Sequence, residues 1–369
     1  MSKVGKSIFQ LLPNLNGGGA ERVAVNLANH WATLGYDSNV VLMQNRGPLS
    51  SFLLPTVSVH DLRIPRIRNL AYRLIRFFQV KRPDITLVHM WPITSVAILS
   101  WRLAGSPGKL FVCEHVGITH HVKADLALPL CIARSVLRLT HPRASGVIAV
   151  SKGAANDLAR LADMRESSIS VIHNPIAKLP LESRVEINTA TKQQLWRGKF
   201  SRHLLSVGTL KSQKNPLLLL DAFSRIANAI DAGLVILGDG PERLKLVRRI
   251  IELGLCNRVS LWGFNSNPMP WMNAADLFVL SSDFEGFANV LVESLSVGTP
   301  VVSTRCPYGP DEIIDHGVHG LLVPTRDSEG LSSAILEALN RHWDPELLQL
   351  RAKEFCIAKQ ADCYLKLFN

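Results

Sequence analysis

The sequence predicts an α/β fold in two domains, each built on a doubly wound parallel sheet of the Rossmann-like kind. The chain has 369 residues, more than one domain usually holds, and 47% of them are hydrophobic, enough for two cores. Short apolar runs typical of buried strands precede glycine-containing loops and then helical patterns, once near the N-terminus and again after residue 200. Strand, glycine loop and helix in that order are the first unit of a Rossmann-like domain.

In the first of these units, residues 8–12 are the predicted strand, and a helix is predicted from about Ala20 to Leu34. Gly17, Gly18 and Gly19 lie between them. Since glycine lacks a Cβ atom, a ligand can approach this loop closely. The spacing differs from GxGxxG, so the loop does not predict a dinucleotide site.

The domain boundaries follow from where this order restarts. We expect the first domain over residues 1–175, the second over 176–350, and a final helix within 351–369, from Arg351 to Phe368. Residues 177–200 lack a clear period and are predicted to be a linker.

The stretch from residue 277 to 303 is the most informative. Leu277–Leu280 is a predicted buried strand, Asn289–Val297 a short helix that ends before Gly298, and the residues up to Ser303 another strand. The loop after the first strand holds Glu285, and the helix holds Glu293.

This loop also offers a site for an anion. Gly286 is expected to let the loop turn sharply. The backbone N–H groups of Phe287, Ala288 and Asn289 then lie at the helix start, where donors lack intrahelical acceptors and favour a phosphate. Two carboxylates repel a phosphate, so their expected partners are neutral polyols such as ribose and a hexose.

Glu285 and Glu293 match the Glu-x7-Glu motif of the retaining glycosyltransferases with the GT-B fold, most closely the large family four. The run Cys306–Ile314 resembles one that is common among members that use UDP-sugars. The resemblance implies two Rossmann-like domains that face each other across a cleft. The first would lie on the acceptor side, the second would bind the nucleotide sugar, and the final helix would return to the first.

The resemblance also implies roles for single residues of the second domain. Glu285 would hold the sugar and Glu293 the ribose. Lys214 matches a lysine that binds the donor diphosphate, whereas Thr209 stands where an arginine is usual. Phe264 follows a short strand at the position that binds the nucleobase.

In the first domain, the resemblance places Gly18 and Gly19 toward the donor. His115 follows the predicted strand 109–114 and matches a family histidine that contacts the donor sugar. His120 and His121 lie close by, but no carboxylate or cysteine pattern surrounds the three histidines, so no metal site is predicted.

The activity implied is retaining, metal-independent transfer of a hexose or N-acetylhexosamine from a nucleotide sugar, with UDP favoured, to a glycan or lipid-linked acceptor. No further cofactor is expected. Because Thr209 weakens the expected phosphate clamp, a catalytically weak or silent sugar-nucleotide-binding homologue is the first alternative. A basic nucleic-acid-binding protein is the second, although no helix-turn-helix, RNP or zinc signature is present.

The net charge of +11 belongs to the first half of the chain. Residues 1–180 hold 21 Lys and Arg against 9 Asp and Glu, whereas residues 181–369 hold 20 against 21. Such an asymmetry indicates an anionic partner. Two basic amphipathic segments contribute to the excess, and they contain Arg66, Arg68, Arg73, Arg76, Arg134 and Arg138.

These segments have two interpretations. Leu70, Leu74, Phe77 and Phe78 can enter an anionic bilayer or pack into a domain core. No signal peptide or transmembrane run is evident, and the six scattered cysteines fit reduced thiols. We therefore expect a cytoplasmic protein that attaches to the cytoplasmic face of a membrane.

Overall fold

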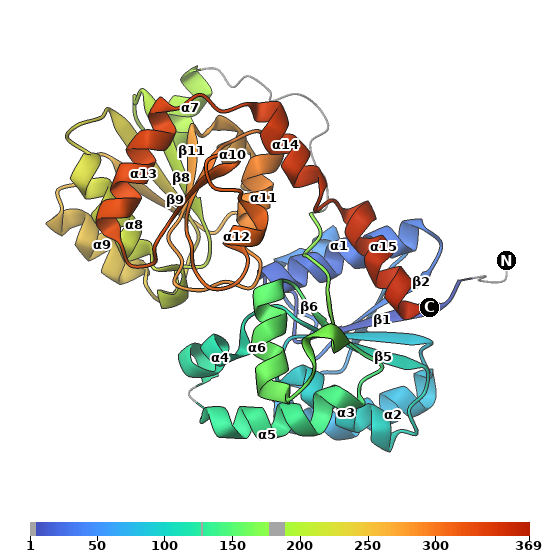
Figure 1. Ribbon diagram of the computed structural model, residues 1–369. Helices are drawn as coiled ribbons and strands as arrows, with labels where there is room; N and C mark the ends of the chain where they lie inside the picture. The colour runs from blue at the N-terminus through green and yellow to red at the C-terminus, as the bar shows by residue number, and fades with distance from the viewer. Residues whose placement is uncertain (1–4, 127, 177–188) are drawn as a thin grey trace. The chain divides into compact units, whose positions relative to one another are not determined.

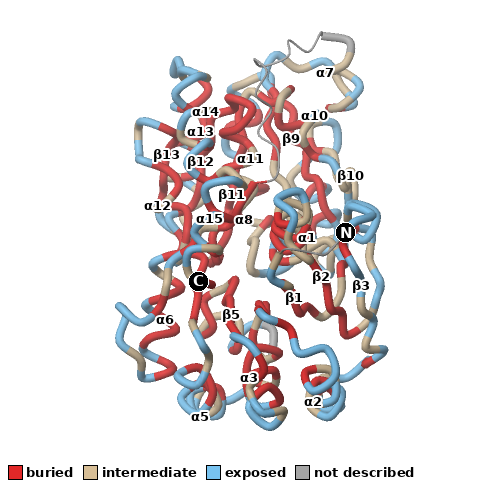
Figure 2. The backbone as a smooth tube through the Cα atoms, turned by 90° about the vertical axis from the view of Figure 1, so that its right-hand side faces the viewer, coloured by how far each residue is buried: buried red, intermediate tan, exposed pale blue. Residues whose placement is uncertain are grey.

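The computed structural model describes residues 5–126, 128–176 and 189–369. The chain divides into two compact units (Figure 1). Unit 1 comprises Met1–Ala177 and Cys356–Asn369, and unit 2 comprises Lys178–Phe355. Each unit has its own parallel sheet and its own buried core, and Figure 2 shows the central strands of both as largely buried.

Unit 1 contains a seven-stranded sheet in which each pair of neighbouring strands is parallel. The strands, in spatial order, are β3 (Ser58–Asp61), β2 (Asp37–Leu42), β1 (Ser7–Leu12), β4 (Ile85–His89), β5 (Lys109–Glu114), β6 (Gly146–Ala149) and β7 (Ile169–Val171). The strand order reverses between β1 and β4, which makes the unit doubly wound.

Helices cover both faces of this sheet. Residues of α2 (Leu70–Lys81), α3 (Ile93–Leu103), α5 (Leu130–Thr140) and α6 (Lys152–Ala162) share one core. On the other face, Trp31 of α1 (Gly19–Thr33) stacks edge-on with Tyr364 of α15 (Ile357–Phe368). The shorter turns are η1 (Pro48–Phe52), η2 (Ile67–Asn69), α4 (Ile118–His121), η3 (Val122–Leu126), η4 (His141–Arg143) and η5 (Glu166–Ser168).

Unit 2 contains a six-stranded parallel sheet. Its strands, in spatial order, are β10 (Val259–Gly263), β9 (Ala232–Leu237), β8 (Arg202–Val207), β11 (Leu277–Leu280), β12 (Val301–Thr304) and β13 (Gly320–Val323). Its helices are α7 (Thr189–Trp196), η6 (Ser212–Lys214), α8 (Pro216–Ile226), α9 (Arg243–Glu252), α10 (Met269–Ala274), α11 (Asn289–Ser296), α12 (Pro310–Ile313), α13 (Ser328–Asn340) and α14 (Pro345–Lys353). The predicted doubly wound α/β class is confirmed in both units.

Two sequence predictions about the connecting segments are wrong. Residues 189–196 form helix α7 rather than linker, because buried Trp196 anchors it by donating from Nε1 to the carbonyl of Leu204 at 3.0 Å. The rest of that linker, residues 177–188, lies outside the described residues.

The final helix also begins later than predicted. The chain is helical to Lys353 and again from Ile357, because Cys356 is extended and forms a bridge with Ile176. Phe355, just before the break, packs against Phe287 of unit 2 at 5.2 Å between ring centroids. Only α15 therefore packs on unit 1.

Candidate functional site

The site in unit 2 lies where the strand order reverses between β8 and β11. In doubly wound sheets, ligands bind at the carboxyl ends of the strands beside this reversal. Lys214 follows β8 and Glu285 follows β11, and Lys214 Nζ lies 2.6 Å from Glu285 Oε1. Glu285 is 5% exposed, so a charged pair is held at the place where this fold receives ligands.

Hydrogen bonds tie the two loops together. The Asp283 N–H donates to the carbonyl of Gln213 at 2.8 Å, and the Gln213 amide donates to the carbonyl of Phe284 at 2.9 Å. The Ser281 hydroxyl donates to the carbonyl of Lys214 at 3.0 Å. The loops are therefore fixed before any ligand arrives, which favours electrostatic stabilisation without reorganisation.

The Glu285 carboxylate is only partly satisfied by the protein. Its Oε1 accepts from Lys214 and also from the Ser282 hydroxyl at 2.5 Å. Within the described parts of the chain, Oε2 has no hydrogen-bond partner. A carboxylate can accept about four hydrogen bonds, so Oε2 can receive sugar hydroxyl groups.

The turn into α11 differs in one respect from the prediction. The helix begins at Asn289 as predicted, but the left-handed residue is Ala288, with φ of 61°, and Gly286 has no positive φ. The following loop packs closely against this turn. Gly309, with φ of 105°, lies so close to Phe287 that a Cβ atom there would be 2.7 Å from the Phe287 backbone. Gly309 is thus a site-shaping residue that the sequence pattern did not reveal.

Glycines at the ends of β8 and β9 allow the backbone to pack closely around the side chain of Lys214. A Cβ on Gly208 would lie 3.4 Å from Lys214 Cε, and one on Gly238 would lie 1.9 Å from the Gly208 oxygen. The loops therefore meet backbone to backbone. Thr209 and Phe264 are both exposed at this edge, Phe264 to 53%.

Glu293 is half-buried in the fifth position of α11. The Ser296 hydroxyl donates to the backbone carbonyl of Glu293 at 2.6 Å, so this hydrogen bond does not involve the Glu293 carboxylate. The assignment of this side chain to a ribose stays a prediction.

In unit 1, His115 lies at the end of β5 within a buried chain of polar groups. His115 Nε2 is 2.9 Å from His89 Nδ1, and His89 Nε2 is 3.0 Å from Gln10 Oε1. Burial lowers the pKa of His115 to about 4, although Glu114 and Asn174 raise it in part. Burial also lowers the pKa of His89 well below its usual value, so both rings are neutral near pH 7.

The residue before His115 is an ionised carboxylate in a dry site. Glu114 is 1% exposed. It accepts from His141 Nε2 at 3.0 Å, from the Thr94 hydroxyl at 2.7 Å and from the Trp91 N–H at 2.8 Å. Burial alone would raise the pKa of this carboxyl, but the hydrogen bonds outweigh it and the pKa is lowered. Glu114 thus fixes the end of β5 from which His115 projects.

A cysteine does accompany the histidines, contrary to the sequence prediction. The ligand atoms of His89, Cys113 and His115 all lie within 4.8 Å of one another. However, His89 Nδ1 and His115 Nε2 are hydrogen-bonded to each other, so these two nitrogens are not both available to a metal ion. Burial raises the pKa of the Cys113 thiol to about 12, so the neutral thiol donates or accepts only weakly, with Tyr364.

The predicted glycine loop forms the start of α1. Gly18 is its N-cap in extended conformation, and a Cβ there would lie 2.3 Å from a carboxylate oxygen of Glu21. The absence of a side chain at Gly18 thus makes room for Glu21. Gly19 is the first helical residue.

Family comparisons match both units. The model "Glycosyltransferase Family 4" matches residues 17–177, and "Glycosyl transferases group 1" matches residues 201–341. Together they span most of the chain. This chain is a family 4 glycosyltransferase.

Similar proteins span most or nearly all of its length. One is an N-acetylgalactosamine-N,N'-diacetylbacillosaminyl-diphospho-undecaprenol 4-alpha-N-acetylgalactosaminyltransferase from Campylobacter jejuni, with 27% identity and 99% of each chain covered. Another is the lipopolysaccharide core biosynthesis glycosyltransferase LpsE of Rhizobium meliloti, with 27% identity over 86% of this chain and 84% of its own.

The same fold occurs in solved structures. Anabaena HepE in complex with UDP-glucose has a TM-score of 0.79 at 21% identity, with 98% of each chain covered. The galactosyltransferase WaaB in its apo form has a TM-score of 0.73 at 19% identity, again with 98% of each chain covered. These likenesses confirm the GT-B fold of this family 4 glycosyltransferase.

Retaining glycosyl transfer is therefore the activity class of the chain, and the nucleic-acid-binding alternative is set aside. The structure brings Lys214 and Glu285 into direct contact. It adds residues that sequence reasoning missed, namely Ser282, Gly309, Gln10 and His89. The roles of the individual site residues stay predictions.

Proposed function

We propose that this glycosyltransferase moves a hexose or N-acetylhexosamine from a UDP-sugar to a hydroxyl of a lipid-linked or cell-surface glycan precursor. The observation that carries the donor assignment is the Lys214–Glu285 pair at the reversal of the unit 2 sheet. The names of the relatives support the sugar and acceptor classes, because they include a structure with UDP-glucose and a transferase acting on a diphospho-undecaprenol glycan.

The pair suits a ligand that carries an anionic diphosphate next to neutral hydroxyls. Without donor, Lys214 neutralises a carboxylate that burial would otherwise destabilise. With donor, Lys214 turns to the diphosphate, and Glu285 accepts hydroxyl groups of the sugar. Glu293 accepts from the ribose, and Phe264 lies toward the nucleobase.

Catalysis then depends on the negative charge that grows on the departing diphosphate. Lys214 and the amides at the start of α11, from Phe287 to Asn289, stabilise that charge. The departing phosphate takes the proton of the acceptor hydroxyl on the same face, so the anomeric configuration is retained. This scheme uses no metal and no cofactor beyond the donor.

A catalytically weak or silent sugar-nucleotide binder is the alternative, favoured by Thr209 in place of the usual arginine. An assay of UDP release with lipid-linked acceptors separates the two, run with and without EDTA. We expect turnover that EDTA leaves unchanged. Donor binding without turnover would favour the silent binder, and loss with EDTA that Mn²⁺ restores would overturn the metal-independent scheme.

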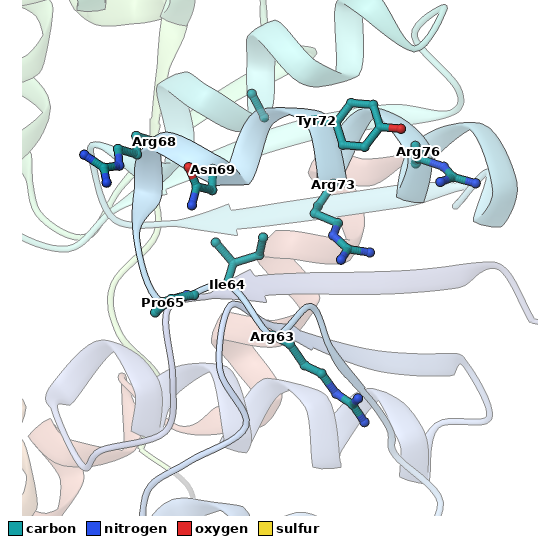
Figure 3. Close-up of a pocket in the computed structure, with 9 residues that line it drawn as sticks. Arg63, Ile64, Pro65, Arg68, Asn69, Tyr72, Arg73 and Arg76 are labelled. Carbon is teal, nitrogen blue, oxygen red and sulfur yellow. The ribbon is translucent and has the colours of Figure 1, made fainter.

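Unit 1 presents a basic layer that we assign to an anionic membrane surface. The layer consists of α2, α3 and α5, which lie in one row in both Figure 1 and Figure 2. Four arginines from the loop before α2 and from α2 itself line one groove, shown in Figure 3: Arg63, Arg68, Arg73 and Arg76. None of their guanidinium groups has an ion pair with any described residue.

The burial of individual residues limits which apolar side chains can contact a membrane. Leu70, Leu74 and Phe78 are buried in the core of unit 1, so the expectation that they enter the bilayer is wrong. Arg138 is also less available than predicted, since it pairs with Asp163 at 3.1 Å.

Other apolar side chains of the same layer are exposed instead. They are Tyr72 and Val80 on α2, Leu99 and Leu103 on α3, and Ile132 and Leu139 on α5. Exposed apolar residues among unpaired arginines suit the boundary between headgroups and acyl chains. None of the described helices is long and apolar enough to span a bilayer. We therefore propose peripheral attachment on the cytoplasmic face.

A further inference from the structure

The arginine groove of unit 1 begins at the carboxyl edge of the sheet. Strand β3 ends at Asp61, and Arg63, two residues later, lines the groove. Because β3 and β5 belong to one parallel sheet, this is also the edge at which His115 follows β5. Doubly wound sheets receive their ligands at this edge, so the groove starts where substrates are expected.

Backbone hydrogen bonds hold the loop at this end of the groove. The Ile64 N–H donates to the carbonyl of Met43 at 2.7 Å, and the Arg63 N–H donates to the Asp61 carboxylate at 2.9 Å. Arg63 has a φ of 58°, a left-handed conformation that is uncommon for residues other than glycine. Such conformations persist only where the surroundings fix them, and they cluster at functional sites. The position of the Arg63 side chain at the mouth of the groove is therefore defined.

The other wall of the groove is one face of α2. Asn69, Tyr72, Arg73 and Arg76 follow the i, i+3, i+4 and i+7 spacing of a single helix face, and all four line the groove. In Figure 3, the Arg73 side chain extends from α2 toward the loop that carries Ile64. The apolar residues of the opposite face are buried in the core of unit 1, so α2 cannot turn its arginines away.

The positive charge of this groove is not balanced by acidic residues nearby in the chain. Residues 62–83 contain seven Arg and Lys and no Asp or Glu. The groove has a volume of about 770 Å³, enough for an anionic group and part of the molecule that carries it. The four charged residues that line it are all arginines, and a guanidinium group binds phosphate oxygens through two parallel hydrogen bonds. The groove therefore suits a ligand that carries phosphate.

We propose that this groove binds the diphosphate that joins the acceptor glycan to its lipid. The inference rests on the proposed lipid-linked acceptor. Such an acceptor brings its hydroxyl to the carboxyl edge and its lipid to the membrane, and the groove connects that edge with α2 of the basic layer. The two adjacent negative charges of the diphosphate can engage several guanidinium groups at once. Contact with a membrane surface alone does not require the arginines to line a hollow.

The first test measures the binding of a soluble probe, so that no bilayer takes part. The probe is N-acetylglucosamine joined to a geranyl chain through a diphosphate, and its control is the same sugar joined to geranyl without phosphate. Titration calorimetry uses the full chain with saturating UDP, which fills the donor site and keeps the probe from Lys214. We expect the diphosphate probe to bind and inorganic pyrophosphate to displace it. Equal binding of the phosphate-free compound would overturn the inference.

The second test removes guanidinium groups from the groove. Arg68/Arg73→Gln should weaken binding of the probe by about 10-fold for each guanidinium, since each forms hydrogen bonds to a charged group. Lys81/Arg102→Gln removes two exposed positive charges from α2 and α3 outside the groove. This control should bind the probe as the wild type does, and UDP affinity should be unchanged in both variants. Equal weakening in both variants would indicate attraction by net charge alone, and unchanged binding in Arg68/Arg73→Gln would contradict the assignment outright.

Anionic vesicles distinguish the groove from the membrane surface around it. If the wild type floats with these vesicles but does not bind the diphosphate probe, the groove is part of the membrane surface and the inference is wrong. The proposed transfer is tested separately by UDP release. Binding of the probe that depends on Arg68 and Arg73, in a protein that releases no UDP with lipid-linked acceptors, would support the groove and contradict the transfer.

Discussion

The two sheets have the same doubly wound topology, but their carboxyl edges are built from opposite chemistry. In unit 2 the edge holds a charged pair, Lys214 and Glu285, with a second ion pair between Arg326 and Asp283 at 2.9 Å. In unit 1, His89 and Gln10 are neutral, and the Glu114 carboxylate beside His115 is already bound by hydrogen bonds from within the protein. A lysine cation suits a diphosphate, whereas neutral acceptors and donors suit hydroxyl groups. The difference indicates that the two edges suit different chemical groups.

Removing the cation from the charged edge should have the largest effect. Lys214→Ala should lower kcat by about 10²–10³, as expected for one preorganised group that stabilises developing charge. Steady-state UDP release measures this. Lys245→Ala removes an exposed lysine of the same unit and is the control. Unchanged turnover of Lys214→Ala would show that Lys214 does not stabilise the departing diphosphate.

The neutral edge should instead make stability depend on pH. The pKa values of His89 and His115 are lowered on folding, that of His115 from 6.5 to about 4. The unfolded chain therefore binds more protons between these values. For His115 the stabilisation is complete above pH 6.5 and is lost as the pH falls toward 4, by up to about 1.4 kcal/mol per pH unit, and the lowered pKa of His89 adds a loss of the same sign. Urea unfolding at pH 7 and pH 5 gives the free energy of unfolding of the wild type and of the double variant His89→Asn/His115→Gln. The wild type should lose more of this free energy between the two pH values than the variant does, and an equal loss in both would contradict the account.

The assignment of Glu293 to the ribose can be tested in the same unit. Glu293→Ala should weaken UDP binding by roughly 1.5–3 kcal/mol, the contribution of one hydrogen bond to a charged group. Titration calorimetry with UDP gives the value, and Glu329→Ala on α13 is a control in the same unit. Equal affinity for Glu293→Ala and wild type would show that the ribose lies elsewhere.

The smallest effect concerns the basic layer outside both edges. Each arginine near an anionic bilayer is worth about 1 kcal/mol. Arg73/Arg76→Glu should therefore reduce flotation with anionic liposomes, and high salt should release the wild type. Arg225/Arg248→Glu, two exposed arginines of unit 2, should float as the wild type does. Equal binding to neutral and anionic lipids would remove the membrane proposal and leave the donor site intact.

The sequence predicted those elements whose formation depends on residues close by in the chain. The strand Leu277–Leu280 and the start of α11 at Asn289 follow from local apolar runs and a helix-end glycine, and both are confirmed. The left-handed turn at Ala288 was not predicted, and neither was the close approach of Gly309, 21 positions later, to the backbone of Phe287.

Contacts between residues that are far apart in the sequence could not be predicted from local patterns either. Gln10 lies in β1, His89 ends β4 and His115 follows β5, and nothing in the spacing of these residues along the chain indicates that they meet. The apolar stripe of α2 was ambiguous for another reason. A helix that faces a core and one that faces a bilayer show the same period, and only the burial of Leu70 and Leu74 decides between them.

The central claim is that the donor diphosphate displaces Glu285 from Lys214 at the charged edge. A crystal structure with an intact, unreacted UDP-sugar tests it most directly. We predict a phosphate oxygen within hydrogen-bond distance of Lys214 Nζ, and a sugar hydroxyl on Glu285. A complex in which the 2.6 Å Lys214–Glu285 pair stays intact, with the nucleotide bound elsewhere, would contradict the account.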